Sequence, residues 1–271
     1  MKSSKELSID SKLIEMLEAF KLSGTALKGL KLLLENKEVQ VLQEFANTVS
    51  IIRLGYNDHG PVHMRTVTHS AMVMMDLIKN AGIKTTLEAD NCGGFEDSLL
   101  AVIISAMLHD IGMTMGRQNH ETHSTILASP IIDQLLSEVY GDNLHKKVAV
   151  RSVALEGIAG HMGSINISSL EAGIVQVADG CDMTKGRARI PIAMAHAPRV
   201  GHIHQYSANS IEEVRMKAGE EKPMRIDVYM SSEVGLFQVE EVLMHKIAAS
   251  TAKQHIELYA QVENSTERRY L

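Results

Sequence analysis

The sequence predicts a mainly α-helical protein, in which a helical bundle is followed by a small C-terminal α+β unit. Apolar side chains recur every three or four residues through most of the chain, which is the period of an amphipathic helix. Beyond about residue 205, short stretches alternate polar and apolar side chains, which is typical of strands. We therefore divide the chain into a helical domain, residues 1–205, and an α+β unit, residues 206–271.

The composition is that of a globular protein and argues against several classes of function. Hydrophobic residues make up 45% of the chain, and the longest apolar run, Leu99–Leu108, is too short to cross a bilayer. The net charge of −6 argues against nucleic acid as a partner. Cys92 and Cys181 are far apart, as in proteins of a reducing compartment. The N-terminus has no signal-peptide pattern, so we expect a cytoplasmic protein without a membrane partner.

The first helices of the bundle include one with a histidine on its apolar face. Periodicity predicts helices over residues 9–21, 24–50 and 61–79, with Pro61 at the first position of the third. The apolar stripe of the third helix is Val67, Ala71, Met74 and Ile78. His63 lies one turn before Val67 and extends this stripe toward the core. His69 is roughly 240° further around the helix, at about 100° per residue, and should face solvent. His59 is interpreted as a turn or rim residue.

A helix that is apolar on nearly every side is expected over residues 97–111, so this helix should be buried. It ends in His109-Asp110, and Gly112 is a plausible stop. A carboxylate is badly placed there, because the helix dipole is negative at the C-terminus and because burial of an ion is costly. A bound cation removes both penalties, so the pair indicates a metal site if further ligands lie nearby.

Three further helices place polar side chains at similar positions. They are expected over residues 120–140, 143–162 and 169–183. His161 continues the apolar face of the second helix, and Asp179 continues that of the third. At the start of the first, either His120 or His123 is a candidate ligand, and spacing does not separate them. Asp182, one turn after Asp179, is a candidate to orient a ligand.

These inward-facing side chains form a candidate metal site. Helix bundles build such sites from side chains that project inward from several helices. Imidazole and carboxylate ligands suit Fe, Mn, Zn or Mg rather than a metal that prefers thiolates.

A basic run follows the last candidate ligand, with Lys185, Arg187 and Arg189 within five residues. One interpretation is a phosphate clamp, because Arg binds phosphate oxygens with two parallel hydrogen bonds. The other is a solvated turn. Arg117, between His109-Asp110 and His120, is a second candidate of the same kind.

The C-terminal unit is expected to combine strands with one helix. Alternation predicts strands over residues 211–217, 224–230 and 255–262, and a helix over residues 237–250.

The ordered set of candidate ligands resembles the HD superfamily. Its signature is a helical His, a His-Asp pair that ends a buried helix, further histidines and a late Asp. Here it reads His63, His109-Asp110, His120, His161 and Asp179, with the local phrases Met107–Gly112 and Val177–Asp179. Members often have Ser or Gly four residues after an additional ligand His, as Ser124 follows His120, which favours His120 over His123. Residues 56–63 also resemble an uncharacterised prokaryotic subgroup of the superfamily.

The resemblance implies a helical HD domain and a metal-dependent phosphohydrolase. Four ligands, namely His63, His109, Asp110 and Asp179, imply one metal ion. Addition of His120 and His161 implies two divalent ions with Asp110 as the bridge, as in dinuclear members. The expected substrate is a nucleotide or another small phosphate ester. Asp110 would then act at the reacting centre, and Lys185, Arg187 and Arg189 would neutralise phosphoryl oxygens.

Two other functions remain open at this point. The same six ligands occur in HD-type diiron oxygenases, which oxidise a C–H bond, and a non-catalytic interaction module with a vestigial metal site is a third possibility. The Gly-Tyr-Pro motif of the cyclic-dinucleotide phosphodiesterases and the Glu-Asp pair of the alarmone hydrolases are absent from the sequence. The α+β unit is a candidate for homodimer formation or ligand sensing.

Overall fold

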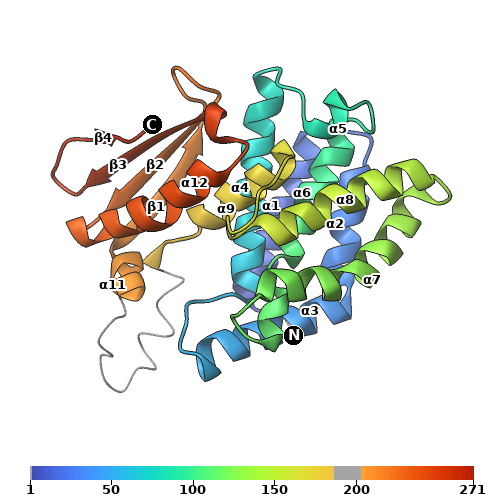
Figure 1. Ribbon diagram of the computed structural model, residues 1–271, viewed down its shortest axis with the longest axis horizontal. Coiled ribbons are helices and arrows are strands. Elements are labelled where there is room, and N and C mark those ends of the chain that lie inside the picture. Colours follow the sequence, from blue (N-terminus) through green and yellow to red (C-terminus); the bar gives the residue numbers. More distant parts are fainter. Residues whose placement is uncertain (1, 186–202) are drawn as a thin grey trace.

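Helix α6 (Phe95–Leu108) runs through the middle of the helical part, and its residues from Asp97 to Leu108 are all buried. The computed structural model describes residues 2–185 and 203–271. Helices α2, α4, α8 and α9 all pack against α6. The helices thus surround one apolar helix, and the four-stranded sheet lies beside them at one end of the molecule (Figure 1).

The described elements follow the predicted order. The helical part comprises α1 (Ser4–Ala19), α2 (Thr25–Glu35), α3 (Lys37–Asn47), the π-helix η1 (Thr48–Arg53), α4 (Pro61–Asn80), α5 (Thr86–Ala89), α6, the 3-10 helix η2 (Ile111–Met115), α7 (His120–Tyr140), α8 (Leu144–Gly160) and α9 (Leu170–Cys181). The remainder comprises α11 (Ile203–Ser210), β1 (Ile211–Lys217), β2 (Met224–Met230), η3 (Glu233–Gly235), the π-helix η4 (Gln238–Leu243), α12 (Met244–Ala249), η5 (Lys253–His255), β3 (Ile256–Val262) and β4 (Arg268–Arg269). The protein is therefore mainly α with a small C-terminal α+β unit, as predicted.

Two predicted helix boundaries were wrong, for identifiable reasons. The helix expected over residues 24–50 is divided at Asn36, whose side chain accepts a hydrogen bond from the Val39 amide at 3.1 Å and so caps α3 instead of continuing α2. The helix expected over residues 97–111 ends at Leu108. Asp110, with φ −105° and ψ 3°, leaves the helical conformation and leads into η2. The helix therefore ends before the His-Asp pair, and Asp110 belongs to the turn that leads into η2.

The apolar length of this core segment does not indicate a membrane span. Among the described residues, Phe95–Met115 has the length and mean hydropathy of a span, but 89% of its most apolar window is buried inside the protein. A helix that is apolar all round is expected in the centre of a globular core.

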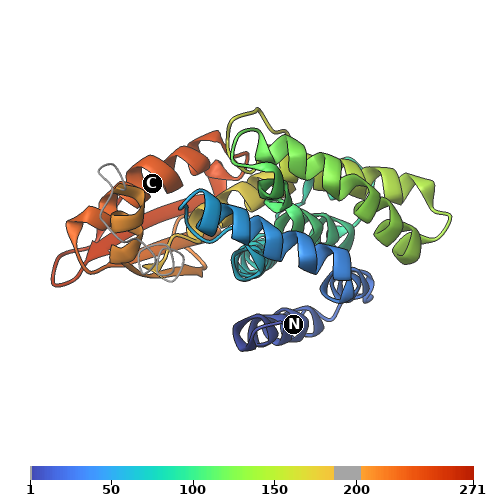
Figure 2. The same ribbon diagram turned by 90° about the horizontal axis from the view of Figure 1, so that it is seen from below.

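A buried ion pair fixes helix α4 against the N-terminal helices. Arg65 on α4 is 1% exposed, and its Nε donates to Asp10 of α1 at 2.6 Å. The same guanidinium donates to the Gln43 side chain of α3 at 2.9 Å. Figure 2 shows α1 on the outer side of this layer. A buried arginine with these partners holds α4, the helix that carries His63, in one register.

The C-terminal sheet has the order β1-β2-β3-β4. β1 and β2 are antiparallel, whereas β2 and β3 are parallel with Met224 opposite Ile256. Parallel neighbours need a crossover connection, and here it contains η4 and α12. Helix α12 packs on α9, and the apolar core is continuous from the helical part into the sheet. The crossover thus lies directly beside a helix that carries a candidate ligand.

Candidate metal centre

Five helices bring the six candidate ligands to one place. His63 lies in the first turn of α4, and His109 and Asp110 follow α6. His120 is the first residue of α7, His161 directly follows α8, and Asp179 lies near the end of α9. All six are at most 5% exposed. Each ligand is near a helix end, so the helix axes converge on the cluster while their apolar faces stay in the core.

The first donor group combines two imidazoles and two carboxylates. His63 Nε2 lies 3.3 Å from Asp110 Oδ2, 3.2 Å from Asp179 Oδ1 and 3.1 Å from His109 Nε2. His109 Nε2 lies 3.4 Å from Asp110 Oδ2 and 3.7 Å from Asp179 Oδ1. Each of the two carboxylate oxygens thus lies within 3.7 Å of both imidazole nitrogens.

The second donor group uses the other oxygen of the shared carboxylate. Asp110 Oδ1 lies 3.1 Å from His120 Nε2 and 3.4 Å from His161 Nε2, and these two nitrogens are 3.1 Å apart. The structure brings His120, and not His123, into this group. Asp110 therefore lies between two sets of donors, with one oxygen directed to each.

The spacing of the donors fits metal coordination. Bonds of ~2.0–2.2 Å place neighbouring ligand atoms about 2.8–3.6 Å apart in octahedral or tetrahedral geometry. The donor distances given above lie within this range, except the 3.7 Å between His109 Nε2 and Asp179 Oδ1, which lies slightly above it. Imidazole nitrogens and carboxylate oxygens are also the ligand types that Fe, Mn and Zn accept.

The second ring nitrogen of each candidate histidine contacts an oxygen, which orients the ring. His109 Nδ1 lies 2.9 Å from the Ala106 carbonyl, and His161 Nδ1 lies 2.7 Å from the Ile158 carbonyl. Both carbonyls belong to the last helical turn, where no amide of the helix is available to them. His63 Nδ1 lies 2.6 Å from Asp182 Oδ2, and His120 Nδ1 lies 3.0 Å from the Arg117 carbonyl.

These contacts decide which ring nitrogen faces the cluster. In a metal-bound ring the proton would stay on Nδ1 and be donated to this oxygen, so that the lone pair of Nε2 would face the metal, and Nε2 points inward in all four rings. Asp182 therefore orients His63, as the sequence suggested for a residue one turn after Asp179.

The surroundings favour the ionised carboxylates of Asp110 and Asp179 and the neutral imidazole of His161, which are the forms that bind metals. Burial opposes ionisation of Asp110, yet the nearby His109 and His59, with hydrogen bonds from His109 and His120, hold its pKa well below the usual range. Burial lowers the pKa of His161 to about 4, against the opposing hydrogen bond to Asp110.

The turn after the His-Asp pair is held tightly against α7. The Gly112 amide donates to Ser124 Oγ at 2.8 Å. A Cβ at Gly112 would lie 2.0 Å from the His120 carbonyl oxygen, so only glycine fits there. Ser124 thus joins the Asp110 turn to the first turn of α7, the turn that carries His120.

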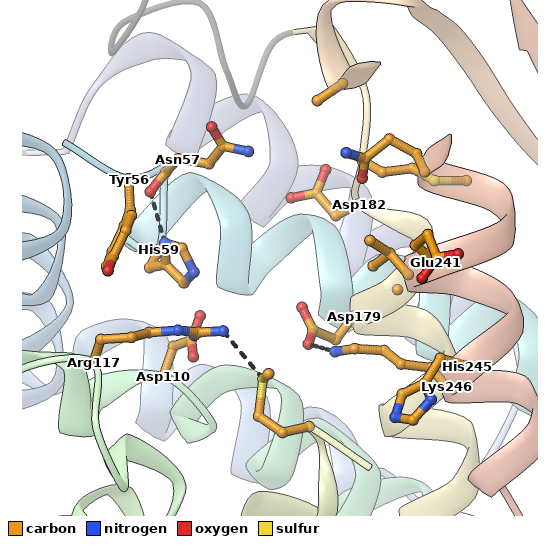
Figure 3. A pocket seen from close by; sticks show the side chains of 16 residues that line it. Tyr56, Asn57, His59, Asp110, Arg117, Asp179, Asp182, Glu241, His245 and Lys246 are labelled. Carbon is orange, nitrogen blue, oxygen red and sulfur yellow. Dashed lines mark hydrogen bonds and ion pairs between the residues drawn. The ribbon is translucent and has the colours of Figure 1, made fainter. Parts of the chain in front are cut away.

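A cavity of about 580 Å³ opens onto the cluster. Figure 3 shows Tyr56, His59 and Arg117 on one side of it and Glu241, His245 and Lys246 on the other. The first wall belongs to the helical part and the second to the crossover of the C-terminal unit. The cavity gives a ligand access to Asp110 and Asp179, which both line it.

The basic run of the sequence is only partly within the described residues. Arg187 and Arg189 lie outside them, so their role as a phosphate clamp stays a prediction. Lys185 pairs with Glu212, is largely exposed, and is not among the residues that line the cavity.

Two histidines differ from the expectation for their positions. His59 was interpreted as a rim residue but is only 8% exposed, and its Nδ1 lies 2.6 Å from the Asn57 carbonyl and 2.9 Å from Ser50 Oγ. His69 was expected to face solvent but is half-buried, because α1 covers that side of α4. Burial and the nearby Lys12 charge lower the pKa of His69.

Lys246 was not among the residues predicted from the sequence. Its side chain is 6% exposed, and Nζ donates to Asp179 Oδ2 and to the His161 carbonyl. Burial opposes ionisation of Asp179, but the Lys246 charge and hydrogen bonding to His63 hold its pKa well below the usual range. The available signal was position, since Lys246 lies on the face of the predicted helix that Val239, Leu243 and Ile247 define.

His63→Ala is expected to remove bound metal, whereas His69→Ala should leave metal content unchanged. The two residues share α4, but only His63 directs Nε2 to the cluster. His69→Ala instead removes half-buried contacts, so its effect should be a modest loss of thermal stability. Elemental analysis and thermal unfolding of both variants test this prediction. Metal loss in His69→Ala with retention in His63→Ala would reverse the assignment.

Comparison with known proteins agrees with this geometry. The HD domain model matches residues 63–184, which extend from the first to just beyond the last candidate ligand. The uncharacterized protein MJ1020 of Methanocaldococcus jannaschii is 41% identical over 231 residues, which are 85% of this chain and 87% of that protein. Ribonuclease Y of Clostridium novyi is 31% identical over 134 residues, which are 46% of this chain but only 24% of that protein. No solved structure matches the chain.

The chain belongs to the HD-domain superfamily, a superfamily of metal-dependent phosphohydrolases. HD domains bind divalent metal ions, and the buried His and Asp clusters described above are suited to hold them.

Proposed function

We propose that the protein is a phosphohydrolase with two divalent metal ions and that it cleaves a small phosphate ester. The observation that carries the proposal is the shared carboxylate: Asp110 directs Oδ2 to one donor group and Oδ1 to the other. The metals expected for these ligands are Fe, Mn, Zn or Mg. When bound, two such metal ions lower the pKa of a water molecule and stabilise charge on a phosphoryl group.

The protein's own residues would organise the reaction around this centre. His63, His109 and Asp179 would hold one ion, and His120 and His161 the other, with Asp110 common to both. The oriented rings and ionised carboxylates leave little rearrangement to be made when metal binds. Hydrogen bonds that the four Nδ1 atoms donate to Asp182 and to backbone carbonyls would keep the imidazoles in place during turnover.

The position of Arg117 supports the proposal that the substrate carries a phosphoryl group. Its guanidinium lies beside Asp110 at the cavity wall (Figure 3). Its side-chain contacts among the described residues are His120 Nε2 at 3.4 Å and Met162 Sδ at 3.7 Å, and neither partner is a carboxylate. A cation without an acidic partner next to the reaction centre is suited to bind phosphoryl oxygens.

The size of the cavity and the charge of the chain support a small substrate. A volume of about 580 Å³ lies in the range of small-molecule sites. Because one relative is named a ribonuclease, an RNA phosphodiester is the competing substrate. A chain with a net charge of −6 does not have the strongly basic character expected of an RNA-binding protein. We therefore favour a nucleotide or another small phosphate ester.

The test is elemental analysis of protein purified without chelator, followed by a screen of phosphate esters with the metal found. Two metal ions per chain and release of inorganic phosphate from at least one small ester are expected. Oxygen consumption by the iron-loaded protein without ester hydrolysis would instead establish the oxygenase. Metal binding without either activity would favour an interaction module, and cleavage of RNA alone would contradict the small-substrate assignment.

A further inference from the structure

The C-terminal unit reaches into the metal centre through one buried lysine. Lys246 lies on α12, far from the HD-domain segment in sequence, and is 6% exposed. Its Nζ donates to Asp179 Oδ2 and, at 3.0 Å, to the carbonyl of His161. One ammonium group thus contacts the ends of both α8 and α9, and each of these helix ends carries a candidate ligand. Figure 3 shows the contact with Asp179.

The contact gives the two oxygens of Asp179 different partners. Oδ2 accepts from Lys246, while Oδ1 lies 3.2 Å from His63 Nε2 and 3.7 Å from His109 Nε2. A cation that merely took the place of the metal would contact Oδ1, the oxygen that faces the imidazoles. Lys246 instead contacts the opposite oxygen, so it sets the rotation of the carboxylate and leaves Oδ1 directed at the donor group.

Close packing keeps the lysine in this position. A Cβ at Gly180 would lie 3.1 Å from Lys246 Cδ and 3.2 Å from Leu243 Cδ1, so the glycine permits the lysine stem to cross α9. About two turns earlier on the same face of α9, a Cβ at Gly173 would lie 2.2 Å from Thr251 Oγ1. Ser250 Oγ also donates to the Gly173 carbonyl at 2.9 Å. Both glycines of α9 therefore allow α12 and the residues that follow it to pack closely against α9.

We propose that the C-terminal unit is an integral part of the metal centre and that Lys246 is a positioning residue for Asp179. The unit would thus support binding of the ion held by His63, His109, Asp110 and Asp179. The inference rests on the metal-binding part of the proposed function and not on the identity of the ester. Metal affinity, measured without any substrate, therefore separates its failure from failure of the phosphohydrolase assignment.

The test is Mn²⁺ titration of the whole chain in wild type and in Lys246→Met. Calorimetry and electron paramagnetic resonance are used to monitor the binding. Methionine keeps the length of the stem and removes the charge and the donors. Partners that orient a metal ligand typically contribute about 10- to 100-fold to affinity, so one of two Mn²⁺ ions should bind that much more weakly. The spectrum should change from a coupled pair to a single ion at limiting metal. The control is Lys253→Met, an exposed lysine of the same segment, which should bind both ions normally.

Two additional variants keep the test decisive if Lys246→Met does not fold. Lys246→Arg retains a cation and donors and should retain more of the affinity. Gly180→Ala leaves the lysine in place but brings a methyl group against its stem, and it should weaken the same ion to a smaller degree. Unchanged or higher affinity for both ions in Lys246→Met, or in Gly180→Ala if the former is unfolded, overturns the proposal. Equal weakening of both ions would also contradict it, because Lys246 contacts a side chain of only one donor group.

Discussion

Asp110→Ala is expected to release both metal ions and to reduce activity to background, the largest effect of any single substitution. Within residues 2–185 and 203–271, Asp110 is the one residue whose two oxygens face separate donor groups, at 3.3 and 3.4 Å on one side and 3.1 and 3.4 Å on the other. Loss of metal-based stabilisation should lower kcat/KM by on the order of 10³-fold or more. Elemental analysis of the purified variant measures the first effect, and ester hydrolysis measures the second.

His161→Ala is the matched comparison for this experiment. His161 belongs to one donor group alone, so its removal should leave about one ion per chain in place of two. If Asp110→Ala retained one ion as well, the carboxylate would not bridge. If wild type bound only one ion under saturating metal, the dinuclear assignment would fail while the mononuclear set around His63 could remain.

Arg117→Ala is expected to lower kcat/KM by about 10²–10³-fold without removing metal, as is typical when one donor to a developing oxyanion is lost. The guanidinium lines the cavity beside Asp110, and its contacts among the described residues are to a ring nitrogen and a thioether. Steady-state kinetics on variants of equal metal content provide the measurement. The affinity of the metal-loaded protein for inorganic phosphate should fall in parallel.

The control for Arg117 is Arg151→Ala. Arg151 pairs with Asp133 on a partly exposed helix surface, at 3.1 Å, and does not line the cavity. Its removal should leave kcat/KM unchanged. Wild-type kinetics in Arg117→Ala would transfer the phosphate-binding role to the basic run at Arg187 and Arg189.

Helical periodicity predicted the inward orientation of three of the six candidate ligands because it is a local property. Whether a side chain continues an apolar stripe follows from spacing alone, and His63, His161 and Asp179 all continue such stripes into the core. The same argument predicted that α6 is buried. The error at His69 has the same origin, since periodicity describes one helix and cannot show that α1 covers its outer side.

Features that depend on distant contacts could not be predicted from spacing. Lys246 follows Asp179 by 67 residues, and only the docking of α12 on α9 brings them together. Arg117 was a candidate because of its place between His109-Asp110 and His120. Its position at the cavity wall depends on a turn with positive φ at Gly116 (118°) and Asn119 (56°), whose course no period describes. The capping action of Asn36 was visible in the sequence but competes with an uninterrupted apolar pattern on either side.

The burial of α6 on every side has a thermodynamic consequence. A helix with a solvent-facing side can fray or open locally at low free energy, but α6 has no such side, and its backbone can be exposed only when its neighbours separate. The shared ligand Asp110 follows directly after this helix. Metal release by a local opening is therefore unfavourable, and the free energy of metal binding is added to that of global unfolding. A chelator should lower the unfolding temperature of the whole protein rather than loosen one segment.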